Sequence, residues 1–258
     1  MSGTEERLLA YPFVLLSELR DAANEHGYRI GPEEAGGWIF FRSASAPGEI
    51  GLAAANGTGP FFLSLMLPGV ARALDAQPAA PCAKGHAGAF MFATRDELHA
   101  GVQAVYRLSV SLPNFPLEKY ENAVAGVGET EGERAQKFRI GQNIFRDALM
   151  EYWSGTCPLS GISNPALLRA SHMIPWSDCT TDAQRLDVHN GLLLSALWDA
   201  AFDAGLVTFD DDGAILTSPQ LEVAAHQALG VGTTLRLALR DEHRPYLAYH
   251  RNHVWMQR

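Results

Sequence analysis

The chain has 258 residues, of which 47% are hydrophobic and 19% are charged, as in a globular protein that buries a sizeable core. The net charge of −9 argues against strong nonspecific binding to nucleic acid, because that needs clustered Lys and Arg. No apolar run is long enough to span a bilayer. The segment 1–13 has acidic residues where a signal peptide would have basic ones, so we expect a cytoplasmic protein with no membrane partner. The three cysteines form no CxxC pair, and we expect neither disulfides nor structural zinc.

The first half of the chain alternates helical and strand-like patterns. A helix after Thr94 has Glu97 in the position of a capping box. Turn signals rich in Gly, Pro and Asn separate the short apolar runs. Helices are predicted at 5–26, 68–76 and 95–112, and strands at 38–41, 50–53, 61–65 and 89–92. Together these elements predict an α+β domain of unassigned fold over residues 1–125.

A segment rich in Gly and Glu, residues 126–133, is predicted to link this domain to a second one over residues 134–258. The second domain starts with a predicted amphipathic helix from Arg134 to Trp153. A tight turn is expected at 157–161, before the first strand of the stretch described next.

The stretch from Leu167 to Asp203 organises the second half. An apolar strand ends in Ser171 and His172, and a polar excursion leads to Asn190. A second apolar run follows, and then a short helix that carries Asp199 and Asp203. The predicted order is therefore strand, long loop, strand, helix, with a histidine at a strand end and a carboxylate near a helix start.

This stretch resembles the HNH endonuclease family in residues 170–176, 189–195 and 199–205. The preceding helix resembles the family too, in Arg139, Gly141, Gln142, Phe145 and Arg146. The resemblance covers residues 134–258 and does not reach the N-terminal half. It implies an α+β chain whose C-terminal half is a ββα-metal (HNH) nuclease domain with flanking helices.

The resemblance also implies roles for individual residues. His172 matches the first His of the family name and is the expected general base, for which its ordinary pKa is suited. Asn190 is expected to hydrogen-bond the loop backbone and to set where His172 points. Asp199 stands where the family has its final His and is the expected metal ligand, with Ser171 and Asp203 as further candidates. An oxygen site of this kind favours Mg²⁺, with Mn²⁺ as an alternative, although Asp203 also fits a purely structural role.

Contacts to DNA are expected from side chains on the flanking helices and the first strand. Two alternatives remain open for the arginines among them: phosphate contact, or a helix surface with intrahelical pairs such as that of Arg146 with Glu151. The candidates are Arg139, Gln142, Arg146, Arg169, His250 and Arg251.

These features predict a metal-dependent endonuclease of the restriction type that hydrolyses double-stranded DNA. The N-terminal half is expected to be a target-recognition module, sensing a base modification, or else a dimerisation module. Cleavage of both strands by a finger with one histidine favours a homodimer. The competing hypothesis is a non-catalytic DNA- or partner-binding protein on a degenerate finger, because Asp199 replaces a histidine.

Overall fold

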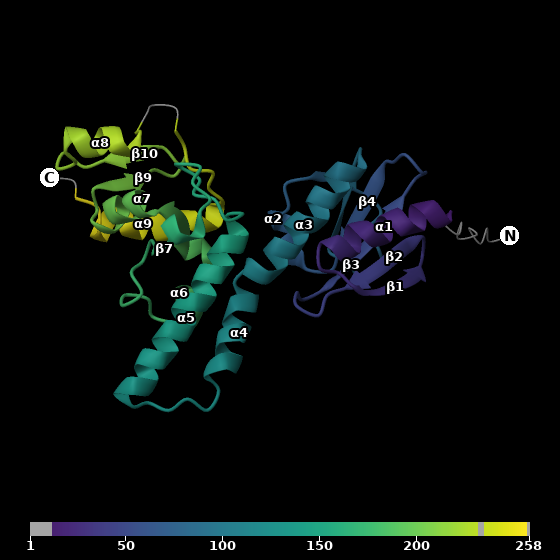
Figure 1. Ribbon diagram of the computed structural model, residues 1–258, viewed down its shortest axis with the longest axis horizontal. Coiled ribbons are helices and arrows are strands. Elements are labelled where there is room, and N and C mark those ends of the chain that lie inside the picture. Colours follow the sequence, from purple (N-terminus) through teal and green to yellow (C-terminus); the bar gives the residue numbers. More distant parts are fainter. Residues whose placement is uncertain (1–11, 232–234, 257–258) are drawn as a thin grey trace. The chain divides into compact units, whose positions relative to one another are not determined.

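The computed structural model describes residues 12–231 and 235–256. It is a mixed α+β structure in which the chain forms two compact units, residues 1–110 and 111–258. The α+β class predicted from the sequence is confirmed. Figure 1 shows the elements of each unit, coloured along the chain.

The first unit is built on a six-stranded sheet in which every neighbouring pair of strands is antiparallel. The strands follow each other across the sheet in the order β1-β2-β3-β4-β6-β5. The elements are α1 (Phe13–Glu25), β1 (Ile30–Ala35), β2 (Trp38–Arg42), β3 (Glu49–Ala54), β4 (Phe61–Leu65), α2 (Pro68–Ala73), β5 (Gln77–Ala79), β6 (Gly88–Phe92) and α3 (Arg95–Ser111).

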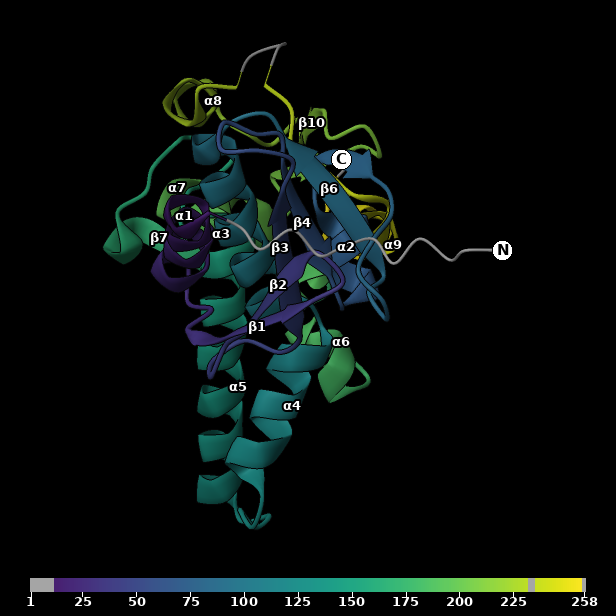
Figure 2. The ribbon, with the colours of Figure 1, turned by 90° about the vertical axis from the view of Figure 1, so that its right-hand side faces the viewer.

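Helices α1 and α3 lie side by side next to this sheet (Figures 1 and 2). The Arg95 guanidinium of α3 pairs with Glu18 of α1 at 2.6 Å. Gly101 lets α3 approach β6 closely, because a Cβ there would lie 2.4 Å from the ring of Phe92. The capping box predicted for α3 is present, since Thr94 Oγ1 accepts from the amide of Glu97 at 3.2 Å and the Glu97 carboxylate accepts from the amide of Thr94.

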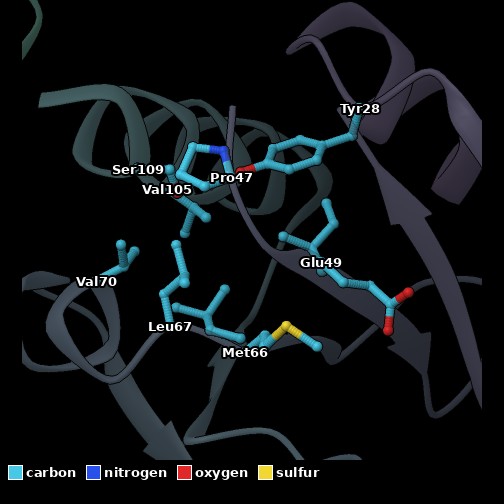
Figure 3. Close-up of a pocket in the computed structure, with 10 residues that line it drawn as sticks. Tyr28, Pro47, Glu49, Met66, Leu67, Val70, Val105 and Ser109 are labelled. Atoms are coloured by element: carbon cyan, nitrogen blue, oxygen red, sulfur yellow. The ribbon is translucent and has the colours of Figure 1, made fainter. Parts of the chain in front are cut away.

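A small cavity lies between the sheet and α3 of the first unit (Figure 3). Its volume is about 10 Å³, and the lining includes Tyr28, Glu49, Leu67 and Ser109. Burial raises the pKa of Tyr28 to about 12, so the phenol stays neutral there. A space of this size holds one water molecule at most, so the cavity is no ligand site.

The strands predicted in the first half are confirmed as β2, β3, β4 and β6, and the three helices as α1, α2 and α3, although residues 5–11 of the first lie outside the described residues. Two strands were not predicted. β1 is an edge strand whose residues are nearly all exposed, so it lacks the alternation that marks a half-buried strand. β5 has only three residues, including Pro78.

The second unit contains a helical hairpin and the ββα stretch. Helices α4 and α5 lie side by side in it (Figure 2). Its elements are α4 (Asn114–Val124), α5 (Glu131–Tyr152), β7 (Leu168–His172), α6 (Asp182–Leu186), β8 (Gly191–Ser195), α7 (Ala196–Asp203), β9 (Val207–Phe209), β10 (Ile215–Thr217), α8 (Val223–Leu229) and α9 (Arg244–His253).

The segment 126–133, predicted to be an interdomain linker, lies inside the second unit and joins α4 to α5. Its last residues already belong to a helix, because Thr130 and Glu133 form a capping box that starts α5. The division between the compact units falls instead between Val110 and Ser111, at the end of α3.

Within the described residues, none of the helices combines the length and the apolarity that crossing a bilayer requires. Cys82, Cys157 and Cys179 are free thiols, and the latter two are buried.

Candidate active site

Strands β7 and β8 pair antiparallel, with Ser171 opposite Leu192 and His172 opposite Gly191. Helix α7 starts directly after β8, with Ser195 as its N-cap residue. The chain thus forms the predicted strand, loop, strand and helix in that order. Pairing places His172, at the end of β7, beside the start of β8.

Helix α5 packs closely against this stretch at two glycines. A Cβ on Gly191 would lie 2.4 Å from the ring of Phe145, and one on Gly141 would lie 2.6 Å from the ring of Trp176. A larger residue at either position would push α5 away from β8 or from the loop after β7. The two glycines therefore fix the distance between α5 and the residues around His172.

Asn190 holds the loop between the two strands. It is fully buried, its Oδ1 accepts from the amide of Ile174 at 2.8 Å, and its Nδ2 donates to the carbonyl of Gln184 at 3.1 Å. Its own carbonyl accepts from the amide of Met173 at 2.9 Å. A side chain so enclosed does not reach a substrate, and its bonds position the residues on either side of His172.

Arg185 holds the same loop from its other side. Its guanidinium donates to the carbonyls of Cys179 at 2.5 Å and Trp176 at 3.3 Å, and pairs with Asp182 at 2.9 Å. Its backbone carbonyl accepts a hydrogen bond of 2.9 Å from Nε2 of His172. Because a carbonyl can only accept, this bond places the proton of the neutral imidazole on Nε2.

The imidazole of His172 is thereby fixed in orientation and in tautomer. It stacks on the ring of Phe145, with the centroids 3.8 Å apart, and meets the edge of Trp176. Burial lowers the pKa of His172 to about 4, so the ring is neutral at pH 7. Nδ1 carries the free lone pair and has no hydrogen-bond partner among the residues described. A neutral imidazole with one nitrogen held and the other free can act as a general base. The lowered pKa differs from the ordinary value expected from the sequence and makes the ring a weaker base.

Two carboxylates lie on helix α7. Ser171 is 2% exposed, and its hydroxyl donates a short hydrogen bond to Oδ1 of Asp199. Asp203 follows one turn later on the same face of the helix. Burial of its carboxyl group, and after it the charge of Asp199, raise the pKa of Asp203 to about 6, although the residue as a whole is exposed.

The histidine and one of these carboxylates line a common cavity of about 380 Å³. It is formed by residues of α5, β7, the loop after it, α7 and α9. Its lining residues are Gln142, Ala170, Ser171, His172, Pro175, Trp176, Asp203, His250 and Val254.

The donor set suits a hard divalent cation. Burial is the main cause of the raised pKa of Asp203, and the negative charge of Asp199 adds to it. A divalent cation beside the two carboxylates would offset that repulsion. The Ser171 hydroxyl donates to Asp199 and so helps to orient that carboxylate. Asp199 and Asp203 are the carboxylates of this stretch that could hold such an ion, and Ser171 bonds the first of them.

The four predicted DNA-contacting residues outside α9 have different environments. Arg146 donates to the carbonyls of Leu168 at 2.8 Å and Pro165 at 2.7 Å, and Arg169 donates to those of Ala166 and Leu168. Both guanidinium groups therefore hold the turn before β7. Gln142 is exposed and lines the cavity, and Arg139 is exposed one turn before it on α5.

The two residues of α9 predicted to face DNA are engaged within the second unit. His250 is 1% exposed, its Nδ1 bonds Thr208 Oγ1 at 2.9 Å, and its Nε2 donates to the carbonyl of Phe202 at 3.1 Å. Arg251 donates to the carbonyl of Phe209 at 2.8 Å and pairs with Asp211 at 2.7 Å. The reason is the packing of α9 on α7 and β9, which the sequence pattern of α9 alone does not specify.

Two contributors to the site were not predicted in their roles. Phe145 was named as one of the helix residues that resemble the family, with no role assigned, and it forms the stacking surface for His172. Arg185 carried no signal, because its contribution is a backbone carbonyl, which every residue possesses.

Comparison with known proteins agrees with this geometry. Residues 157–210 match the HNH endonuclease family (HNH_2), and this segment contains β7, β8 and α7. The match lies in the C-terminal half and includes His172, Asn190, Asp199 and Asp203. It indicates a nuclease, with DNA as the substrate and a divalent metal as the usual cofactor of such domains. No curated protein matches the chain.

Proposed function

We propose that this protein is a metal-dependent endonuclease that hydrolyses DNA phosphodiester bonds in the cavity between α5, β7 and α7. The observation that carries the proposal is the state of His172, whose Nε2–H is held by the Arg185 carbonyl while Nδ1 is left as a free lone pair. The carboxylates of Asp199 and Asp203 on the adjacent helix supply the second requirement, a place for a cation.

In this mechanism Nδ1 of His172 accepts a proton from a water molecule as that water attacks the phosphorus atom. The hydrogen bond to the Arg185 carbonyl strengthens as the ring becomes positively charged, which stabilises the imidazolium. Stacking on Phe145 keeps the ring from rotating away from the cavity. The role of Asn190 is to position this loop, since it is fully buried.

Asp199 and Asp203 would hold the divalent cation, and oxygen donors favour Mg²⁺ or Mn²⁺. When bound, such an ion neutralises negative charge on the scissile phosphate and on the leaving oxygen. Ser171 keeps Asp199 in its rotamer through the hydroxyl hydrogen bond. Arg139 and Gln142, exposed at the same side of α5, are placed to contact phosphates that flank the scissile bond.

A restriction-type role belongs to the same proposal, with the first unit as the recognition module. Each ββα stretch has one general base, His172, and cuts one strand at a time. A two-fold homodimer therefore accounts most simply for cleavage of a duplex. Free thiols fit a reducing compartment such as the cytoplasm. Sedimentation with and without DNA tests the dimer, and a monomer that releases only nicked circles contradicts it.

Plasmid nicking in the presence of EDTA, Mg²⁺ or Mn²⁺ tests the activity itself. We expect no cleavage in EDTA and restored cleavage when Mg²⁺ or Mn²⁺ is in excess. Plain and base-modified plasmids are compared in parallel, because preference for one of them tests the recognition role separately. Absence of cleavage with every metal and both substrates overturns the proposal.

One observation favours the partner-binding form of the alternative, a protein without activity on a degenerate finger. Four arginines of the second unit are engaged within the protein and are not available to phosphate, namely Arg146, Arg169, Arg185 and Arg251. That alternative does not explain why Nδ1 of His172 is left without a partner among the described residues. DNA binding that persists in EDTA, together with an absence of cleavage, is the result that would favour its DNA-binding form.

A further inference from the structure

A cluster of metal-binding side chains lies in the first unit, where α1 ends beside α3. Glu25 is the last residue of α1, His26 is its C-cap, and His99 lies on α3. One ligand atom from each of the three residues lies within 4.8 Å of the other two. These residues belong to a different unit from the cavity of His172, so the proposed nuclease mechanism does not use them.

We infer that Glu25, His26 and His99 form a binding site for a divalent transition-metal ion of the Zn²⁺ class. Nε2 of His26 lies 3.3 Å from Nδ1 of His99, and Nδ1 of His99 lies 3.3 Å from Oε2 of Glu25. Ligand atoms about 2.0–2.1 Å from a tetrahedral Zn²⁺ are separated by about 3.3–3.4 Å. Both separations therefore match the edge of a zinc tetrahedron, and the third pair of ligand atoms lies within 4.8 Å.

The identity of the donors selects the metal. Two imidazoles and one carboxylate suit Zn²⁺, Co²⁺ or Ni²⁺, whereas Mg²⁺ and Ca²⁺ prefer sites made of oxygen. The side chain of Glu25 is 65% exposed and that of His99 31% exposed, so water has access to a fourth coordination position. The site is therefore of the open three-ligand type and differs from a closed cysteine site.

The surrounding contacts hold together the two helices that carry the ligands. The Arg95–Glu18 ion pair joins α1 to α3 at 2.6 Å, and Tyr28 meets Tyr106 edge to face. Between His26 and Tyr28 the chain turns at Gly27, where φ is +91° and a Cβ would lie 2.6 Å from the Tyr106 ring. Only glycine fits this turn without strain, and the turn sets the direction of His26.

A hydrogen-bonded cluster without metal is the competing explanation of the same distances. In it, a proton lies either between His26 Nε2 and His99 Nδ1 or between His99 Nδ1 and Glu25 Oε2, and the other contact of 3.3 Å has none. A metal ion accepts a lone pair from all three atoms at once. The two explanations differ in whether the cluster binds a cation, which can be measured.

Calorimetric titration with Zn²⁺ in excess Mg²⁺ tests the site in the full-length chain carrying Asp199→Asn, which removes a proposed ligand of the nuclease site. We expect one Zn²⁺ per chain. In the same background, His99→Ala and, separately, Glu25→Gln weaken Zn²⁺ binding at least tenfold. The matched controls His226→Ala and Glu34→Gln, which change the same residue types elsewhere, leave the affinity unaltered.

Co²⁺ gives an independent readout, because four-coordinate Co²⁺ absorbs visible light far more strongly than six-coordinate Co²⁺. We expect the strong absorption in the Asp199→Asn chain and its loss in Glu25→Gln, a change on an exposed side chain that leaves the core intact. Absence of Zn²⁺ binding, or an affinity that neither His99→Ala nor Glu25→Gln changes, overturns the inference and leaves a hydrogen-bonded cluster only. Either result is independent of whether the chain cleaves DNA.

Discussion

His172 and His250 are packed in the same way, but their ring nitrogens are engaged differently. Each imidazole stacks on a phenylalanine with the centroids 3.8 Å apart, Phe145 in one case and Phe202 in the other. Burial lowers the pKa of both histidines to about 4. Neither the packing nor the protonation state therefore distinguishes a catalytic histidine from a structural one.

The difference lies in the nitrogen atoms. His250 uses Nδ1 with Thr208 and Nε2 with the Phe202 carbonyl, so it has no lone pair left for a substrate. His172 uses Nε2 with the Arg185 carbonyl and leaves Nδ1 free beside the cavity. A free acceptor in a cavity, held by a bond on the other side of the ring, is what marks the candidate base.

The largest expected effect comes from His172→Ala. Loss of a general base costs about 10²–10⁴-fold in rate, so we expect the initial rate of plasmid nicking to fall by that factor at pH 7.5 in Mg²⁺. Circular dichroism checks that the variant is folded. A variant that is folded and nicks as fast as the wild type removes His172 from the mechanism.

His250→Ala tests the other half of the comparison. Removing a buried ring and its two hydrogen bonds leaves a cavity and unpaired groups, so the free energy of unfolding should fall by about 2–4 kcal/mol. Urea denaturation measures this loss. The nicking rate of the folded fraction should fall far less than in His172→Ala. Equal losses of rate in the two variants would mean that both histidines take part in the reaction.

Acid should destabilise the protein through histidines that are buried neutral. Burial lowers the pKa of His243 and of His250 to about 4, below their value near 6.5 in the unfolded chain. Their contribution to stability is therefore complete above pH 6.5 and is lost as the pH falls toward 4. Between pH 7 and pH 5 the free energy of unfolding should fall by about 1–2 kcal/mol for each histidine.

Urea denaturation at pH 7, 6 and 5 measures this dependence, and His250→Gln is its control. Glutamine does not titrate, so the variant should lose stability less steeply with acid than the wild type, whatever its stability at pH 7. Parallel curves for the two proteins would show that His250 does not contribute to the pH dependence.

Local patterns in the sequence were enough to predict most of the fold. The predicted strands and helices of the first half are present, because each had its own alternation or helical spacing. The exceptions in that half are elements without such a signal: the exposed strand β1, the three-residue β5, and α4, which contains Pro116. In the second half the short elements α6, β9, β10 and α8 were not predicted. The composition of 126–133 suggested a linker, but Thr130 and Glu133 cap a helix there.

The part of the site that depends on residue spacing along the chain was predictable. The order of His172, Asn190 and Asp199 located the ββα stretch, and it matches a known family there. Partners distant in sequence were not predictable, since a motif does not specify which carbonyl a side chain meets. The environments of Arg146 and His250 show this, and so does the pairing of His26 with His99, which lies 73 residues away.

The smallest expected effect tests whether the distinction between free and engaged groups also holds for arginines on α5. Arg139 is exposed and has no hydrogen bond or ion pair among the residues described, whereas Arg146 binds two backbone carbonyls of the turn before β7. Arg139→Gln should therefore weaken DNA binding only a few-fold, similarly for all sequences, because it removes one phosphate contact. The slope of log affinity against log salt concentration should fall by about 1. Fluorescence anisotropy with a labelled duplex in Ca²⁺, at several salt concentrations, measures both quantities.

Arg146→Gln is the matched control, and it should lower the free energy of unfolding by leaving the carbonyls of Leu168 and Pro165 without their donor. If Arg139→Gln leaves the salt slope unaltered while Arg146→Gln reduces it, the guanidinium that contacts phosphate is the one already engaged in the fold, and the distinction drawn from His172 and His250 does not extend to this helix.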